Sequence, residues 1–82
     1  MTQNIKPTRT LDCIGLYCPE PVLRTRMELD KIATNEVLEV LADDPSAEED
    51  IKSLVKRTGH ALLNIEKEGN ILRFIIRKIE RG

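Results

Sequence analysis

A cysteine stands immediately before the Pro-x-Pro segment Pro19–Pro21. Proline is favoured at the first helical position, because its missing N–H would have no partner there in any case. Cys18 is therefore predicted to be the N-cap of a helix that continues over Val22–Ile32. Unpaired backbone N–H groups and the positive end of the helix dipole would favour its thiolate. We expect the pKa of Cys18 to lie below that of a free cysteine, which suits a nucleophile.

The other residues that could support chemistry form weaker patterns. Four residues separate Cys13 from Cys18, which matches neither the C-x-x-C motif of dithiol oxidoreductases nor a zinc pair. The single histidine, His60, is expected at the surface near a strand end, so neither a zinc site nor a Cys–His pair is indicated. Asp44 is interpreted as the N-cap of a second helix rather than as an acid–base group. A nucleophilic sulfur without a base or cofactor suits a carrier, which holds a group covalently between two proteins.

Composition limits the fold and the partners. The 82 residues are enough for one domain with a modest core, predicted over residues 8–82 after a flexible tail at 1–7. The net charge of -1 implies no attraction to nucleic acid or to an anionic membrane. No apolar run approaches the ~20 residues of a membrane span. Two cysteines are too few for a disulfide framework, so we expect a cytoplasmic protein with reduced thiols. We also expect the free protein to be a monomer.

Apolar periodicity and turn residues predict the order β-α-β-α-β-β, an α/β two-layer sandwich. Two helices can cover only one face of a four-stranded sheet. The expected elements are a strand at Thr8–Cys13, a turn at Ile14–Tyr17, helices at Val22–Ile32 and Ser46–Thr58, and strands at Val37–Ala42, His60–Lys67 and Ile71–Lys78, with a hairpin turn at Glu68–Asn70.

Side-chain alternation predicts which residues enter the core. Met27 is expected to fill a gap in the core beneath the first helix. In the third strand, Leu63 is expected to face the helices, and Leu62 the opposite side. Ile71 and Ile75 would share that opposite side with arginines, where they would face water or a partner.

The segment Leu11–Leu23, LDCIGLYCPEPVL, resembles the Cys-Pro-x-Pro signature of the TusA/SirA-like family of sulfur-carrier proteins. Asp43–Pro45 and Thr58–His60 are similar as well, in the same order and at similar spacing, so the resemblance extends from about Arg9 onward. It implies a four-stranded mixed sheet with two helices on one face. It also implies a persulfide on Cys18, received from a cysteine desulfurase or a rhodanese-like or DsrE-like donor. The sulfur would pass to an acceptor protein in tRNA thiolation, molybdenum-cofactor assembly or sulfur metabolism, with no bound cofactor.

The resemblance implies a sulfurtransferase-type carrier rather than a stand-alone enzyme. Cys13 departs from the family pattern, and we expect it to be structural rather than a resolving thiol. A two-cysteine redox switch and a non-catalytic regulatory interaction module are the alternatives. The candidate site residues are Cys18 as the sulfur-bearing residue, Gly15, Pro19, Glu20 and Pro21 as support for the loop and helix start, and Cys13, Arg26 and Asp44 as accessory residues.

Overall fold

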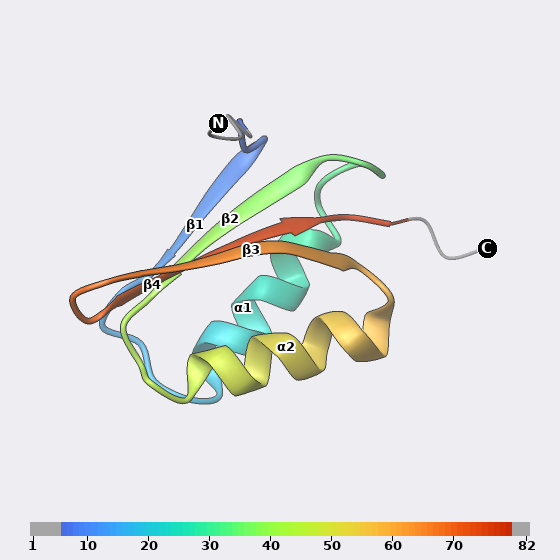
Figure 1. Cartoon of the computed structure of the whole chain (residues 1–82). Coiled ribbons are helices and arrows are strands. Elements are labelled where there is room, and N and C mark those ends of the chain that lie inside the picture. The colour runs from blue at the N-terminus through green and yellow to red at the C-terminus, as the bar shows by residue number, and fades with distance from the viewer. Residues whose placement is uncertain (1–5, 80–82) are drawn as a thin grey trace.

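The computed structural model describes residues 6–79, so most of the expected tail and residues 80–82 lie outside the described chain. Within this part, neither helix is long and apolar enough to cross a membrane. The elements in chain order are β1 (Arg9–Cys13), α1 (Glu20–Leu29), β2 (Val37–Ala42), α2 (Ala47–Thr58), β3 (Ala61–Glu68) and β4 (Ile71–Arg77), as labelled in Figure 1.

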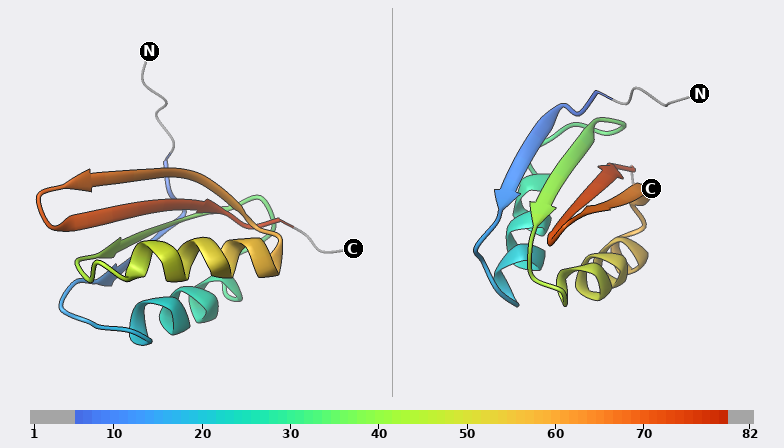
Figure 2. Two further views of the ribbon diagram at one scale, coloured as in Figure 1. Left: turned by 60° about the horizontal axis from the view of Figure 1, so that its bottom comes forward. Right: turned by 60° about the vertical axis from the view of Figure 1, so that its left-hand side comes forward.

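The four strands form one mixed sheet in the order β1-β2-β4-β3. β1 runs parallel to β2, whereas β4 runs antiparallel to both β2 and β3. A parallel pair needs a crossover connection, and α1 supplies it between β1 and β2. Both helices lie on the same face of the sheet (Figures 1 and 2). The predicted α/β architecture, with two helices on one face of a four-stranded mixed sheet, is confirmed.

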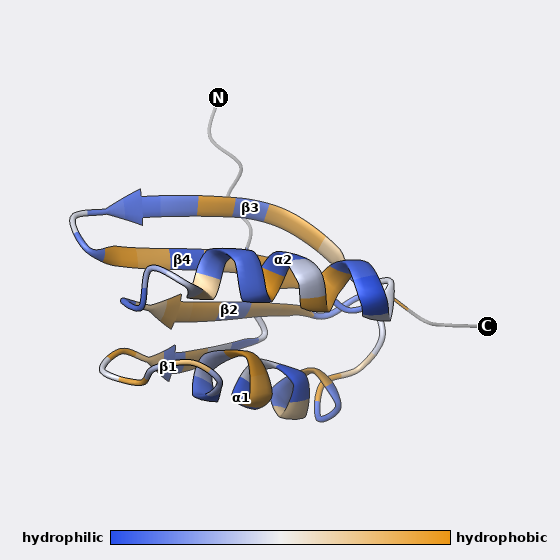
Figure 3. Cartoon of the chain, turned by 90° about the horizontal axis from the view of Figure 1, so that it is seen from below, coloured by the Kyte–Doolittle hydropathy of each residue, from blue (hydrophilic) through white to orange (hydrophobic). Residues whose placement is uncertain are grey.

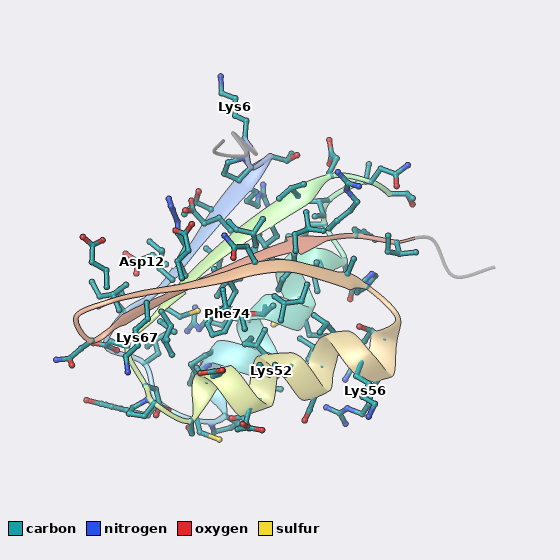
Figure 4. The ribbon with its side chains drawn as sticks, viewed as in Figure 1. Lys6, Asp12, Lys52, Lys56, Lys67 and Phe74 are labelled. Carbon is teal, nitrogen blue, oxygen red and sulfur yellow. The ribbon has the colours of Figure 1, made fainter. Side chains whose placement is uncertain are left out.

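The core lies between the sheet and the helices. Phe74, at the centre of β4, is fully buried there, and Figure 4 labels it between the sheet and the helices. α2 presents an apolar side to it because its apolar residues recur at helical spacing. Removal of this surface from water is the main force that holds the helices on the sheet. The buried core residues are Cys13, Leu29, Ile32, Leu38, Val40, Ala42, Ala47, Ile51, Leu54, Val55, Leu72, Phe74 and Ile76.

The buried side of α1 differs from the prediction. Pro21, Thr25 and Leu29 face the core at successive i, i+4 positions. Thr25 is tolerated there because its hydroxyl donates a hydrogen bond of 2.7 Å to the Pro21 carbonyl oxygen. Leu23 and Met27 lie on the outer side, 47% and 58% exposed. The expectation that Met27 fills the core is therefore wrong.

A β-bulge changes the side-chain alternation of β3. The pairing with β4 shifts between Leu62 and Asn64, so one extra residue interrupts the alternation of faces. Leu62 and Ile65 consequently pack against the core, whereas Leu63 is 37% exposed. The predicted positions of Leu62 and Leu63 are thus reversed, because strict alternation does not hold across a bulge.

The face of the sheet that the helices leave open is covered in part by its own charged side chains. Arg73 on β4 lies between two carboxylates, with its Nε 2.6 Å from Glu39 Oε2 and its Nη1 3.4 Å from Glu66 Oε1. Ile75 is only 7% exposed on this face, whereas Ile71 near the hairpin is 43% exposed. The long polar side chains therefore shield part of the apolar surface that was expected to face water.

Replacement of Phe74 tests this account of the core. Phe74→Ala should lower the free energy of unfolding by about 3–5 kcal/mol, because it removes a buried ring and leaves a cavity. Leu63→Ala, in the exposed bulge of β3, should change it by about 0.5 kcal/mol or less. Urea denaturation followed by circular dichroism measures both, and similar losses in the two variants would contradict the assignment of inner and outer residues.

Candidate functional site

Two loops meet at one end of the molecule. β1 and β2 are parallel neighbours, so their carboxyl ends lie at the same edge of the sheet. The loop after β1 and the loop after β2 therefore run side by side (Figures 1 and 2). Asp43 Oδ1 accepts a hydrogen bond from the Gly15 N–H at 2.9 Å, and Asp44 Oδ2 accepts one from the Cys18 N–H at 2.8 Å. These two carboxylates fix both ends of the turn that precedes Cys18.

The loop that carries Cys18 is also held by its own backbone. Gly15 has a positive φ of 85°, a conformation that glycine adopts without steric cost, as the sequence predicted. Asp12 Oδ1 accepts the Ile14 N–H at 2.9 Å, and the Leu16 N–H donates to the Cys13 carbonyl oxygen at 3.1 Å. The loop is therefore an ordered turn, which presents the residues that follow it in a defined direction.

Cys18 is not the N-cap of α1. The first helical hydrogen bond runs from the Leu23 N–H to the Pro19 carbonyl oxygen at 3.1 Å, which makes Pro19 the N-cap. The Glu20 N–H donates to the Tyr17 carbonyl oxygen at 2.8 Å, so Cys18 lies within the turn that leads into the helix, directly before the N-cap. The prediction placed the helix start one residue too early, because Pro19 was assigned to the first helical position.

The other predicted support residues occupy the start of α1. Pro19 caps the helix, and Glu20 is its first residue. The Glu20 carboxylate accepts a hydrogen bond from Arg24 Nε at 3.1 Å, an i, i+4 pair on the helix surface. Pro21 is buried against the core. The segment thus anchors the loop to the helical layer and leaves Cys18 itself exposed.

The electrostatic environment of Cys18 opposes the thiolate. The pKa of Cys18 is raised, chiefly by a hydrogen bond to the side chain of Asp50 and then by desolvation and by the negative charges of Asp50 and Asp44. The prediction of a lowered pKa is therefore wrong. A dipole effect from α1 is small and confined to the helix end, whereas two carboxylates from the neighbouring loop and helix act close to the sulfur.

Asp44 joins the two loops through both of its oxygens. Oδ2 accepts the Cys18 N–H, and Oδ1 accepts the Ser46 N–H at 3.1 Å. These bonds favour the ionised form, so the pKa of Asp44 is lowered. α2 begins at Ala47 with Ser46 at the N-cap position. The prediction that Asp44 is the N-cap is therefore wrong, because Asp44 bonds the backbone just before the helix. Its side chain is buried, with 8% of the residue exposed.

The two cysteines lie in different environments. Cys13 is the last residue of β1, has no exposed surface and belongs to the core cluster. Desolvation by burial is the main reason that the pKa of its thiol is raised. Cys18 is exposed, and both cysteines are free thiols. Cys13 therefore lies where a structural residue is expected, and solvent reaches only Cys18.

Arg26 and His60 lie away from this group. Both line a surface cavity next to the last residues of α1 and α2, with Thr58 and Lys78. The Nδ1 atom of His60 accepts the Ile79 N–H at 3.0 Å. Asp50, which contacts Cys18, is in the first turn of α2, whereas His60 comes after the last residue of this helix. Most of the helix length of about 18 Å therefore separates His60 from Cys18. Neither residue is part of the arrangement around the sulfur.

Two members of the group were not identified as site residues. Asp43 and Asp50 were not among the candidate residues predicted from the sequence. The order of the elements contained the signal, because parallel neighbouring strands bring the segments after them to one edge. Any side chain in the loop after β2 or the first turn of α2 is therefore a candidate neighbour of Cys18. Within residues 6–79, no group of His, Cys, Asp and Glu could hold a metal ion.

Comparison with known proteins gives consistent matches. The family model described as Sulfurtransferase TusA matches residues 9–78. A provisionally named sulfur carrier protein of Archaeoglobus fulgidus is 48% identical over 73 residues, which cover 88% of this chain and 95% of that protein. YrkF of Bacillus subtilis, also provisionally named a sulfur carrier protein, is 40% identical over 74 residues, but the chain spans only 40% of its length.

The fold also has a counterpart among solved structures. The crystal structure of a SirA-like protein from Desulfitobacterium hafniense matches with a TM-score of 0.76 and 25% sequence identity. The match covers 88% of this chain and 99% of that one. The β-α-β-α-β-β order with both helices on one face is therefore shared with that protein.

Replacement of Asp50 tests the cause of the raised thiol pKa. In Asp50→Asn the pKa of Cys18 should fall, because the neutral amide no longer penalises the thiolate. The pH dependence of the rate of Cys18 alkylation, followed by peptide mass spectrometry, measures the change. Glu49→Gln is the matched control, since it removes the neighbouring charge of the same helical turn without touching the thiol. An unchanged profile in Asp50→Asn would refute the assigned cause.

Asp44 should make folding sensitive to acid. Because its pKa is lowered in the folded state, its contribution to stability is present above the unfolded pKa of about 3.9 and is lost as the pH falls through the folded value. Asp44→Asn should be less stable at neutral pH and should lose less stability on acidification than the wild type. Urea denaturation over a pH series measures this, with the exposed Asp30→Asn as the control. Parallel acid profiles for Asp44→Asn and the wild type would contradict this role.

Proposed function

The chain belongs to the TusA sulfurtransferase family, and we propose that it carries sulfur as a persulfide on Cys18. The observation that carries the proposal is the contrast between the two cysteines. Cys18 is exposed on a loop that backbone hydrogen bonds hold in place, whereas Cys13 is buried in the core. A sulfur that must be reached by two different proteins in turn has to be exposed, and only Cys18 meets that requirement.

The transfer step is an exchange at sulfur. The Cys18 thiolate attacks the outer sulfur of a persulfide on the donor protein, so a new S–S bond forms at Cys18. The S–S bond of the donor breaks, and the donor cysteine leaves as a thiolate. The proton lost by Cys18 is returned to that thiolate through solvent. One S–S bond replaces another, so the step needs no external oxidant or reductant.

The carboxylates around Cys18 favour the second half of the relay. A persulfide is more acidic than the corresponding thiol, so the loaded carrier bears a negative charge at its outer sulfur. The negative charges of Asp44 and Asp50, which raise the pKa of the free thiol, would also raise the free energy of that anion by repulsion. The same repulsion therefore promotes transfer of the sulfur to an acceptor over its retention on the carrier.

The partners proposed are those that this chemistry requires. A cysteine desulfurase, or a rhodanese-like or DsrE-like protein, presents a persulfide and acts as donor. The acceptor is a protein thiol that serves tRNA thiolation, molybdenum-cofactor assembly or sulfur metabolism in the cytoplasm. The burial of Cys13 counts against a two-cysteine redox switch, because a resolving thiol has to reach the oxidised sulfur.

Sulfur loading tests the proposal directly. The reduced protein, incubated with a cysteine desulfurase, pyridoxal phosphate and cysteine, should gain at least one sulfur atom by intact mass, and a reductant should remove it. Cys18→Ser should gain none, because the hydroxyl is not a nucleophile at neutral pH.

Cys13→Ala is the matched control for this experiment. It should load as the wild type does, since alanine fits the buried position without an unpaired polar group. Loading that persists in Cys18→Ser, or that disappears in Cys13→Ala, would reject Cys18 as the site. A wild-type protein that stays unmodified, both with the desulfurase and with glutathione persulfide, would reject the carrier function.

A further inference from the structure

Large apolar side chains are exposed around Cys18. Six large hydrophobic residues within the described chain are exposed, and four of them belong to the loop of Cys18 or to α1. Ile14 and Tyr17 precede the cysteine in the loop and are 39% and 69% exposed. Leu23 and Met27 follow it on the helix, and Figure 3 shows hydrophobic stretches along this loop and on α1.

The placement of the two helical residues is not explained by the core. Leu23 and Met27 stand two residues before and two residues after the fully buried Thr25, about 160° around the helix from it. A surface helix ordinarily has polar residues on that side. Because leucine and methionine lie one turn apart there, they form a continuous apolar strip. Exposed apolar surface of this kind marks sites of contact with other proteins.

Charge is distributed unevenly around the same site. Residues 12–20 and 43–50, the two segments at the Cys18 end, contain seven carboxylates and no lysine or arginine. The remaining 65 residues contain all 13 lysines and arginines together with the other seven carboxylates. Two of the seven, Glu20 and Glu48, pair with Arg24 and Lys52. The acidity of the Cys18 end therefore comes from the other five, Asp12, Asp43, Asp44, Glu49 and Asp50, although the chain as a whole has a net charge of only -1. Within residues 6–79, Glu49 and Asp50 form no salt bridge.

We propose that Ile14, Tyr17, Leu23 and Met27, together with the acidic residues of segments 12–20 and 43–50, form one docking surface for the sulfur-donating protein. The donor is inferred to present an apolar patch to the four hydrophobic residues and lysine or arginine side chains to the carboxylates. The inference rests on the proposed function, because a docking surface around Cys18 serves a carrier that exchanges sulfur with other proteins. The same acidity would repel nucleic acids and anionic membranes.

Charge complementarity would also couple docking to reactivity. Asp50 and Asp44 hold the free thiol in its protonated form. A cationic side chain of the donor placed against Asp50 would offset this effect and favour the thiolate where the persulfide is presented. Docking on this surface would thus activate Cys18, and steering between opposite charges would speed the encounter.

Binding of a cysteine desulfurase to variants of the docking surface tests the proposal. All carriers have the Cys18→Ser substitution, so that affinity is measured by calorimetry without sulfur transfer. Leu23→Glu and Met27→Glu should each weaken binding about tenfold or more, as the loss of an apolar anchor does. Leu63→Glu, which places the same charge at an exposed leucine of the β3 bulge, should change affinity by about twofold or less.

A second pair of variants tests the acidic component. Glu49→Lys should weaken binding, because it places a positive charge opposite the basic surface of the donor. Asp30→Lys, an equal charge change at the other end of α1, should have little effect on affinity. Raised salt should weaken binding of the carrier that retains Glu49, because screening reduces the attraction between exposed charges.

The results that would contradict the docking surface differ from the result that would contradict the carrier function. Absence of binding by the Cys18→Ser carrier, or equal losses for Leu23→Glu and Leu63→Glu, would overturn the docking surface. Binding that salt leaves unchanged would overturn the basic donor surface. If the docking variants lose affinity as expected while the wild type gains no sulfur from any donor, the docking surface stands and the carrier function fails.

Discussion

The site depends on one carboxylate between two loops. Asp44 accepts the N–H of Cys18 with one oxygen and the N–H of Ser46 with the other, and so ties the end of the β1–α1 loop to the start of α2. The constraint behind it is topological, because parallel neighbours β1 and β2 end at the same edge of the sheet. Together with the bond from Gly15 to Asp43, this bond sets the position of the Cys18 backbone relative to the charges that control its thiol.

Those charges make the free protein a poor nucleophile, which is consistent with a carrier. A catalytic cysteine attacks as the thiolate, which a neighbouring base or a helix N-terminus usually favours. A carrier instead has to survive between partners, and a protonated thiol resists oxidation better than a thiolate. With the proposed role of Cys18, its raised pKa would protect the empty carrier, and a partner that changes the local charge would restore reactivity.

Sequence periodicity located the elements well and their local details less well. β2 was predicted with its observed bounds, because a strand that is apolar apart from Glu39 and lies between turn signals is unambiguous. The buried face of α1 was predicted too wide, because Met27 was assigned to a gap in the core, whereas Pro21, Thr25 and Leu29 form the buried side. The bulge of β3 reversed Leu62 and Leu63 without any signal in the sequence. The thiol pKa was misjudged because Asp50, distant in sequence, decides it.

These corrections bear on function, because an error about the core is also an error about the surface. If Met27 filled the core, the outer side of α1 would be polar and the surroundings of Cys18 would lack apolar character. Since Met27 and Leu23 face outward, hydrophobic residues follow the sulfur along the helix as well as precede it in the loop. In these positions the two side chains do not contribute to the packing of the core. The proposed docking surface would account for their placement, because a sulfur carrier has to contact a second protein at its sulfur.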